Sequence, residues 1–501
     1  MNIAHNIERA CRHFPHKTAL TFEERRYTYR SLHDLVNQFA NVLTGMKIKS
    51  GDRVALFLPN IPEFAIAYLA AQKVGAIAVS VNAMLKQDEV QFILADSSAV
   101  AVVTTGELRA MISSDRLPLL RHIFIAEGEQ RNDLDMYALM GKASTRARAQ
   151  NLHPETPAAI VYTSGTTGFP KGAVLSHGNV LSNAYAKVHY CGMKPTDRMQ
   201  LFLPLFHCFG QNAILNSAFL ACATVVLQRR FVPEQALAAI TEQAVTMFFG
   251  VPALFIRLLH MTPHSYDFSS IRYFFSAAAT LPEEIARRWH ELYRHYIYIG
   301  YGLTETSPFA SYNHDLCYKF GSVGTPIENV EMKVMSLDGG KEVEPGTPGE
   351  IVIRGPNVML SYWQRPEETA QAIRDGWFYS GDIGTMDEDG YFYVVDRLKD
   401  MINVSGFKVY PAEVENVLYK HPAVAETAVY GLPDAIRGET VNAQVILKEG
   451  HETVREEDLI TFCRENMAVY KAPHKMQFVQ TIPQNGAGKI LKRVIRDKEI
   501  K

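Results

Sequence analysis

The chain carries Tyr162-Thr163-Ser164-Gly165-Thr166-Thr167-Gly168-Phe169-Pro170-Lys171-Gly172 directly after the apolar run Ala158-Ala159-Ile160-Val161. Glycines let backbone N–H groups come close to an anion, hydroxyl side chains add hydrogen-bond donors, and Lys171 adds a mobile positive charge. These residue types in this order predict a loop that wraps phosphate groups, and we expect ATP as the ligand.

This loop differs from the common P-loop. The motif G-x-x-x-x-G-K-[ST] has glycine before its lysine and a hydroxyl residue after it to hold magnesium, whereas here Pro170 precedes Lys171 and Gly172 follows it. An ordinary surface turn rich in Ser, Thr and Gly would explain a few of these residues but not the whole order.

Four further segments lie downstream, and their order is informative. They are Tyr301-Gly302-Leu303-Thr304-Glu305-Thr306, Tyr379-Ser380-Gly381-Asp382, Asp396-Arg397-Leu398-Lys399-Asp400 with Gly406 beyond it, and Asn485-Gly486-Ala487-Gly488-Lys489. Together with the phosphate loop they resemble the signature motifs of the adenylate-forming (ANL) superfamily, in its acyl-CoA synthetase and fatty acid–CoA ligase branch. The resemblance covers nearly the whole chain, from Thr28-Tyr29 to Lys489.

Composition favours a soluble enzyme. The 501 residues are 47% hydrophobic, enough to bury large cores, and a net charge of −2 gives no electrostatic case for nucleic-acid binding. Residues 1–5 lack the pattern of a signal peptide, and Gln72 and Lys73 interrupt the apolar stretch 65–85 before it reaches the ~20 residues of a membrane span. We therefore expect no transmembrane segment and a cytoplasmic location.

The cysteines predict neither a disulfide framework nor a zinc site. None of the six (Cys11, Cys191, Cys208, Cys222, Cys317 and Cys463) has C-x-x-C spacing to another. We expect buried thiols.

The periodicity of the chain predicts an α/β fold with largely parallel sheets. Apolar runs at 54–58 and 77–81 alternate with helical stretches at 63–73 and 87–95. Ligands in such folds bind at the carboxyl ends of strands, where the loops after Val161 and Ile299 would lie. After Asp396 the pattern changes to a short strand at 401–404 and a helix at 411–420, which indicates a smaller α+β unit.

The resemblance divides the chain accordingly. It implies a large multi-subdomain N-terminal domain, residues 1–396, that binds the acid and ATP, and a small mobile C-terminal lid, residues 397–501. Lys399 would lie at the hinge about which the lid rotates between two half-reactions. The alternative for Lys399 is an ordinary exposed lysine in a linker.

For the nucleotide, the resemblance implies a set of contacts. Asp382 and Arg397 would hold the ribose and the adenylate, although the two could instead form a structural ion pair. Tyr301 would stack on adenine, or else serve core packing. The remaining nucleotide-binding residues implied are Thr163, Ser164, Gly165, Thr166, Thr167, Gly168, Lys171, Ser276, Ala277, Ala278, Gly300 and Gly302.

The chemistry requires positive charge, because a carboxylate must attack the α-phosphorus of ATP although both are anionic. The resemblance implies that Glu305 holds Mg²⁺, that Thr304 donates to the α-phosphate, and that Lys489 neutralises charge in the transition state. For Lys489 the alternative is a lysine that caps a helix.

The acid should be hydrophobic. Residues 202–210 (Phe-Leu-Pro-Leu-Phe-His-Cys-Phe-Gly) resemble the family segment that lines the acyl pocket, with Phe206 and His207 at its centre, and Gly250, Val251 and Pro252 resemble its walls. Relatives that activate amino acids place an aspartate just after the aromatic residue, where this chain has His207. A fatty or other hydrophobic acid is therefore favoured. His207 could steer the carboxylate or be a core residue.

The second half-reaction would pass the acyl group from AMP to a thiol, beside the loop that contains Gly406. We favour coenzyme A as the acceptor, because the chain has none of the extra insertion found in many relatives that load carrier proteins. The alternative is an acyl-AMP ligase that loads the phosphopantetheine arm of an acyl carrier protein. Intact Thr304, Glu305, Asp382 and Lys489 disfavour a catalytically silent binder. Monomer and homodimer both remain open.

Overall fold

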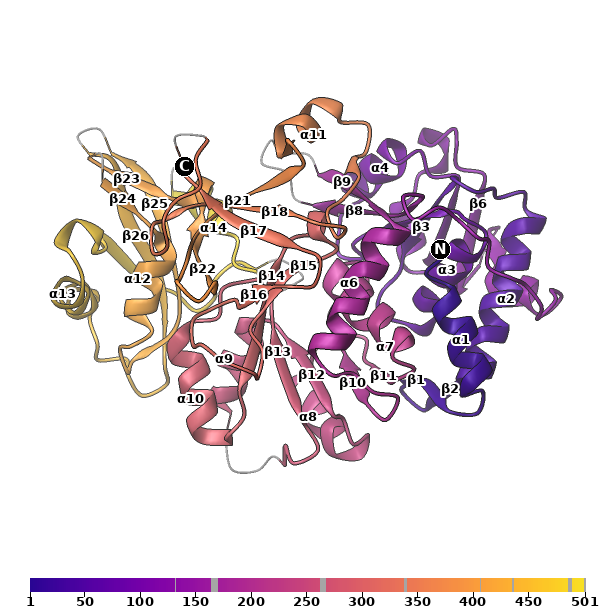
Figure 1. Cartoon of the computed structure of the whole chain (residues 1–501), viewed down its shortest axis with the longest axis horizontal. Coiled ribbons are helices and arrows are strands. Elements are labelled where there is room, and N and C mark those ends of the chain that lie inside the picture. Colours follow the sequence, from indigo (N-terminus) through magenta and orange to yellow (C-terminus); the bar gives the residue numbers. More distant parts are fainter. Residues whose placement is uncertain are drawn as a thin grey trace.

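The computed structural model describes residues 1–130, 132–163, 170–261, 267–337, 340–405, 407–434, 437–484 and 489–499. Two large sheets with their helices form most of the chain, and a smaller sheet leads to a C-terminal unit at the opposite end of the molecule from the N-terminal helices (Figure 1). This arrangement confirms the expected fold class, a large α/β region with parallel sheets followed by a small C-terminal α+β unit.

The first large sheet contains the predicted alternation of strands and helices. Its order is β19 (Ser361–Tyr362), β9 (Lys171–Ser176), β8 (Pro157–Thr163), β4 (Ile77–Ser80), β3 (Arg53–Phe57), β5 (Ala101–Thr105), β6 (His122–Glu127) and β7 (Leu134–Asp135). Neighbours from β8 to β7 pair in parallel, whereas β8 and β9 form an antiparallel pair in which Thr163 lies opposite Lys171. The phosphate loop therefore joins two adjacent strands.

The second large sheet supplies the floor of the site. Its order is β16 (Thr325–Pro326), β15 (Phe309–Tyr312), β14 (Ile297–Gly302), β13 (Tyr273–Ser276), β12 (Met247–Gly250), β10 (Arg198–Leu201), β11 (Thr224–Leu227), β1 (Thr18–Phe22) and β2 (Arg25–Thr28). In the parallel register, Gly250 lies beside Ser276 and Ser276 beside Ile299. The carboxyl ends of three strands thus meet at one edge of the sheet, which is where ligands of α/β folds commonly bind.

Helices cover both sheets and bury them. Residues of α3, such as Phe64 and Tyr68, belong to the same hydrophobic cluster as Leu56 of β3 and Leu201 of β10, so one core joins the two sheets. The helices are α1 (His5–His13), α2 (Tyr29–Gly45), α3 (Pro62–Lys73), α4 (Gln87–Asp96), α5 (Met136–Met140), α6 (His177–Tyr190), α7 (Ser217–Leu220), α8 (Pro233–Glu242), α9 (Pro252–His260), α10 (Glu283–Tyr293), α11 (Pro366–Ala372), α12 (Pro411–Leu418), α13 (Glu456–Asn466) and α14 (Lys492–Glu499).

The two smaller sheets lie at the C-terminal side. One runs β17 (Glu331–Met335), β18 (Gly349–Arg354), β21 (Trp377–Met386), β20 (Ile373–Arg374), with β22 (Phe392–Arg397) paired to β21. The other runs β24 (Phe407–Val409), β23 (Ile402–Val404), β26 (Gly438–Leu447), β25 (Val424–Asp434), with β27 (Lys475–Phe478) paired to β26. The second of these, with α12, α13 and α14, is called the lid below, and it has its own apolar cluster.

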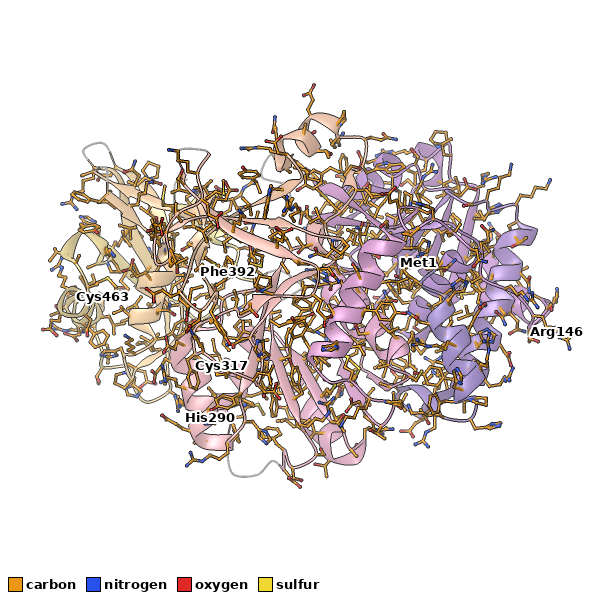
Figure 2. All side chains as sticks on the ribbon, viewed as in Figure 1. Met1, Arg146, His290, Cys317, Phe392 and Cys463 are labelled. Atoms are coloured by element: carbon orange, nitrogen blue, oxygen red, sulfur yellow. The ribbon has the colours of Figure 1, made fainter. Side chains whose placement is uncertain are left out.

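One expectation about the cysteines is wrong. Five are buried as predicted, but Cys317 is exposed, because it lies in the polar loop after β15. Cys317 and Cys463 lie well apart (Figure 2), and all six thiols, which fall within the described residues, are free. No helix in the described part of the chain has the length and apolarity to cross a membrane.

Candidate functional site

A cavity of about 200 Å³ lies where the strand ends of the second sheet face β22 and the lid. Pro252, Ala278 and Tyr301 contribute one wall, Asp382 and Arg397 another, and Lys489 the lid side. The remaining predicted residues that line it are Gly300 and Gly302. Residues 189 apart in sequence, such as Gly300 and Lys489, therefore share one cavity.

Asp382 is held from two sides. The phenolic Oη of Tyr301 donates to its Oδ2 at 2.8 Å, and Nε of Arg397 pairs with its Oδ1 at 2.7 Å. Asp382 is 3% exposed, and its carboxylate lies opposite Arg397 because β21 and β22 pair at these two residues. Asp382 and Arg397 therefore do form an ion pair, and both residues line the cavity.

Small residues shape the strand ends. A Cβ on Gly300 would lie 2.4 Å from Cζ of Phe275, and one on Gly302 would lie 1.9 Å from the carbonyl oxygen of Pro308, so neither position has room for a side chain. Ala278 lines the cavity with a left-handed backbone, φ 73°. Ser276 and Ala277 are buried beneath it, and the Oγ of Ser276 has no hydrogen-bond partner among the described residues.

The end of the phosphate loop lies near Glu305. Residues Ser164, Gly165, Thr166, Thr167 and Gly168 lie outside the described residues, as does Gly406, but Thr163 and Lys171 flank the loop as paired strand ends. Nζ of Lys171 lies 5.4 Å from the ring centroid of Tyr362, whose Oη donates to Oε1 of Glu305 at 2.7 Å. The lysine and the acidic residue are therefore linked through one tyrosine.

Thr304 adjoins the segment that contains His207. Its Oγ1 lies 3.4 Å from Sγ of Cys208, the residue after His207. Nδ1 of His207 accepts a hydrogen bond from the backbone N–H of Phe209 at 3.1 Å, and burial, together with the charge of Lys489, lowers the pKa of His207 to about 4. The ring is consequently neutral at physiological pH with its proton on Nε2, which can donate to an acidic substrate.

Lys489 lines the cavity next to Ile490, which pairs with Gln484 in an isolated antiparallel bridge. The positive charge of Arg397, followed by burial, lowers the pKa of Lys489 to about 8, while Asp382 acts in the opposite direction. This pair of cations is suited to an anionic ligand. The negative charge of such a ligand would offset the repulsion between the ammonium of Lys489 and the guanidinium of Arg397.

Lys399 does not line the cavity. It is exposed in the short helix η6 (Leu398–Asp400), which lies between β22 and β23. Its charge is only a minor cause of the lowered pKa of Lys489.

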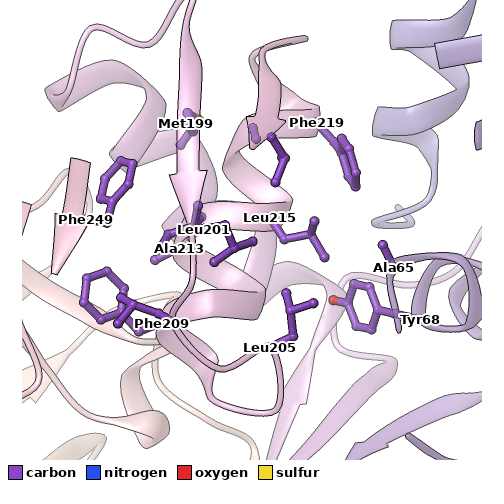
Figure 3. Close-up of a cluster of buried hydrophobic side chains, with 14 of the residues drawn as sticks. Ala65, Tyr68, Met199, Leu201, Leu205, Phe209, Ala213, Leu215, Phe219 and Phe249 are labelled. Atoms are coloured by element: carbon purple, nitrogen blue, oxygen red, sulfur yellow. The ribbon is translucent and has the colours of Figure 1, made fainter. Parts of the chain in front are cut away.

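Of the residues predicted for the acyl pocket, one lines this cavity and four do not. Pro252 lines the cavity, whereas Phe206, His207, Gly250 and Val251 do not. Phe209 and Phe249, their neighbours in sequence, belong to a cluster of buried apolar side chains with Met199 and Leu201 (Figure 3).

Sequence reasoning missed two contacts of the site. Tyr362 holds Glu305, and the only sequence signal is its position in an aromatic pair, Tyr362-Trp363. Asp396 accepts hydrogen bonds from the backbone N–H groups of Arg397 and Ala412, at 2.7 and 2.8 Å, and so ties β22 to the first turn of α12 in the lid. Burial raises the pKa of Asp396 to about 6. Tyr362 and Glu305 lie 57 residues apart in the sequence, and Asp396 and Ala412 lie 16 apart, so no local pattern links the partners.

Comparisons with known proteins show the family of the chain. A family model described as AMP-binding enzyme matches residues 7–363, and one described as AMP-binding enzyme C-terminal domain matches residues 413–489. The chain is 34% identical to a long-chain-fatty-acid–CoA ligase of Bacillus subtilis (97% of this chain, 92% of that protein) and 36% identical to a feruloyl-CoA synthase of Amycolatopsis (97% of both).

Solved structures match equally well. The anthranilate CoA ligase AuaEII in complex with anthranoyl-AMP superposes with a TM-score of 0.94 at 31% identity, over 99% of this chain and 97% of that one. ATP-bound MatB from Rhodopseudomonas palustris gives 0.93 at 31% identity over 99% of both chains.

The fold and the site define an AMP-forming acid–thiol ligase. The chain belongs to the AMP-binding enzyme family, within the acyl-CoA synthetase branch of the adenylate-forming enzymes.

Proposed function

We propose that this enzyme activates a hydrophobic carboxylic acid with ATP and transfers the acyl group to coenzyme A. The observation that supports this most directly is that Lys489 of the lid lines the same cavity as Tyr301 and Asp382. One cavity then offers a stacking surface, a ribose acceptor and a cation, which are the groups that an acyl-adenylate requires.

In the first half-reaction, an oxygen of the acid's carboxylate attacks the α-phosphorus of ATP, and pyrophosphate leaves. Nε2–H of His207 would orient the carboxylate, Thr304 would donate to an α-phosphate oxygen, and the ammonium of Lys489 would stabilise the charge that develops during attack. Tyr301 would stack on adenine while Asp382 accepts from the ribose. Lys171 and the loop 163–168 would hold the outer phosphates.

Glu305 would hold Mg²⁺ on the ATP phosphates. No cluster of three or more candidate ligands occurs in the described residues, and a single carboxylate fits an ion that takes most of its ligands from phosphate and water. When bound, the ion would offset phosphate charge during the attack. Tyr362 would orient Glu305 for this role through the hydrogen bond to its Oε1.

In the second half-reaction, a thiol sulfur attacks the carbonyl carbon of the acyl-adenylate. AMP leaves, the thiol proton passes to solvent, and a thioester remains. We propose that residues 397–501, which include the lid, rotate at Lys399 for this step and withdraw Lys489. The names of the relatives, which are CoA ligases or synthases, support coenzyme A as the acceptor rather than an acyl carrier protein.

The aromatic residues around the acyl segment support a hydrophobic acid. Phe209 packs edge-on against Phe275 and Phe309, with ring centroids 6.0 and 5.6 Å apart, and Phe249 lies 6.0 Å from Phe275. Relatives that act on fatty acids and on aryl acids are both similar to this chain, so both classes belong in the test.

The experiment supplies ATP, Mg²⁺ and a panel of fatty and aryl acids, with coenzyme A or a phosphopantetheinylated carrier protein as acceptor. Mass spectrometry should detect an acyl-CoA together with AMP. An acyl group found only on the carrier protein would replace coenzyme A as the acceptor, and the absence of acid-dependent pyrophosphate with every acid would refute the proposed substrate class.

A further inference from the structure

Lys187, on α6, is a fully buried lysine that the proposed chemistry does not use. Its side chain is 0% exposed, and within the described residues its Nζ has no hydrogen-bond partner and forms no ion pair. Burying an amine in this way is costly, and residues that destabilise a fold without a structural benefit are commonly retained for function.

Five aromatic rings surround this amine. Nζ lies 4.1 Å from the ring centroid of Phe275, 4.6 Å from Phe309, 4.7 Å from Phe249, 5.5 Å from Phe209 and 5.7 Å from Tyr312. Ring faces attract a cation but offer an amine no strong hydrogen-bond acceptor. We call this group, Lys187 with the five rings, the lysine box. Burial lowers the pKa of Lys187 to about 7, and Cys191, just past the end of α6, acts in the opposite direction.

The walls of the lysine box come from the segments that supply the site. Phe209 follows His207-Cys208, Phe249 precedes Gly250, and Phe275 precedes Ser276. Phe309 follows the 3₁₀ helix Thr304–Thr306. The box is thus built from the four segments that surround the expected position of the acid.

Gly300 touches both the cavity and the lysine box. Gly300 lines the cavity, and a Cβ on it would lie 2.4 Å from Cζ of Phe275 and 2.8 Å from Cε1 of Phe309. One turn before Lys187, Nδ2 of Asn183 donates to the carbonyl oxygen of Phe309 at 2.6 Å, which fixes α6 against the Thr304 loop. The rings of Phe275 and Phe309 form no hydrogen bonds, so a change in their rotamers would break none.

We propose, on the basis of the proposed function, that Lys187 determines specificity by donating a hydrogen bond from Nζ to an oxygen at the far end of the acid's acyl group. An acyl group that extends from a carboxylate held at His207 and Thr304 would pass the rings of Phe209 and Phe309 and end at the amine. The oxygen would be neutral, as in a hydroxyl or ketone, or it would belong to a second carboxylate; in both cases it supplies the missing acceptor. A plain alkyl or aryl end leaves the amine unpaired.

The test compares matched acids by initial rates of pyrophosphate release. Each set has one carbon skeleton and three forms: an apolar far end, a hydroxyl or ketone at that end, and a carboxylate at that end. Fatty acids of graded length and a cinnamic acid set cover the two substrate classes. We expect kcat/KM for one oxygen-bearing form to exceed that for the apolar form by roughly 10²-fold, because a site built around a polar group rejects an analogue that leaves the group unpaired.

The variants separate recognition from structure. Lys187→Met keeps the length of the side chain but removes the donor, and it should bring the ratio of oxygen-bearing to apolar acid close to one. Lys187→Gln keeps a neutral donor, and it should retain part of the preference for a neutral oxygen but lose any preference for a carboxylate. The matched control is Lys194→Met, at an exposed position just after α6, which should keep the wild-type ratio. The ratio is internal to each variant, so a loss of folded protein does not change it.

Each outcome decides the matter. A wild-type enzyme that uses the apolar form as well as both oxygen-bearing forms overturns the proposal for Lys187 and leaves the proposed function standing. An unchanged ratio in both Lys187 variants also overturns it. If no acid yields pyrophosphate, the proposed function fails, and the proposal for Lys187 fails with it.

Discussion

The phenolic oxygen of Tyr301 lies 2.8 Å from Oδ2 of Asp382, 81 residues further along the chain. The contact joins the end of β14 in the second sheet to β21 in the third, and it leaves Tyr301 with its hydroxyl engaged at the wall of the cavity. Two roles would explain why this residue is a tyrosine. Its ring would stack on the nucleotide, and its hydroxyl would hold the carboxylate of Asp382 in place for the ribose of that nucleotide.

Replacing Tyr301 by phenylalanine should weaken ATP binding. Tyr301→Phe keeps the ring but removes one hydrogen bond to a carboxylate, which contributes roughly 1.5–3 kcal/mol. We expect the KM for ATP to rise by roughly tenfold while kcat changes little. Steady-state kinetics with ATP as the varied substrate provides the measurement, and Tyr185→Phe, at an exposed tyrosine on α6, is the control. An unchanged KM would show that the hydrogen bond does not support nucleotide binding.

Lys489→Ala should affect the two half-reactions unequally. Loss of a preorganised cation beside the α-phosphorus should slow acyl-adenylate formation by roughly 10² or more. Transfer from supplied acyl-AMP to coenzyme A should fall by less than about threefold, because in the proposed mechanism the lid withdraws Lys489 before this step. Single-turnover measurements of each half-reaction separate the two effects. The exposed Lys498 on α14 gives a control, Lys498→Ala, and equal losses in both half-reactions would contradict the assigned role.

The pair formed by Tyr362 and Glu305 should set the requirement for magnesium. Glu305→Gln removes the charge that would hold the ion, so the Mg²⁺ concentration for half-maximal adenylation should increase by roughly tenfold or more. Tyr362→Phe only releases Oε1 of Glu305 from its hydrogen bond, and we expect a shift in the same direction but smaller. Titrations of Mg²⁺ at fixed ATP measure both. A magnesium requirement that neither variant changes would remove Glu305 from the metal site.

Lys187→Met should stabilise the protein, and the gain should depend on pH. The native pKa of Lys187 is lowered from its usual 10.5 to about 7, so between these values the unfolded state binds more protons than the native state. Stability of the wild type therefore rises with pH across this window, and the penalty of the buried amine is largest below its lower end. We expect the variant to gain about 1–3 kcal/mol below the window and progressively less within it.

Melting temperatures of wild type and variant, at about pH 6 and about pH 9, test this expectation. The exposed Lys194→Met should show no such difference. A variant that is less stable than the wild type at about pH 6, where the amine is charged, would mean that cation–π contacts with the five rings outweigh the cost of burial.

The sequence specified the local elements well where a residue pattern repeats. The alternation at 53–96 gave β3, α3, β4 and α4 within a few residues, because β-branched runs and helical periodicity act over short distances. Several residues of its family motifs, among them Tyr301, Asp382 and Arg397, line the cavity. The sequence did not reveal that Cys317 is exposed or that Phe206 and His207 lie outside the cavity lining, because burial depends on how distant segments pack.

By itself the sequence determined the superfamily and the fold class, because these follow from motifs of a few adjacent residues and from short-range periodicity. Only the tertiary structure decided which of these groups contact each other: Tyr362 with Glu305, Tyr301 with Asp382, and the amine of Lys187 with five rings from four segments. Such contacts connect residues tens to hundreds of positions apart, and no local pattern encodes them. An isolated lysine in a helix is usually solvated, and only the packing of the sheet against α6 buries the amine of Lys187.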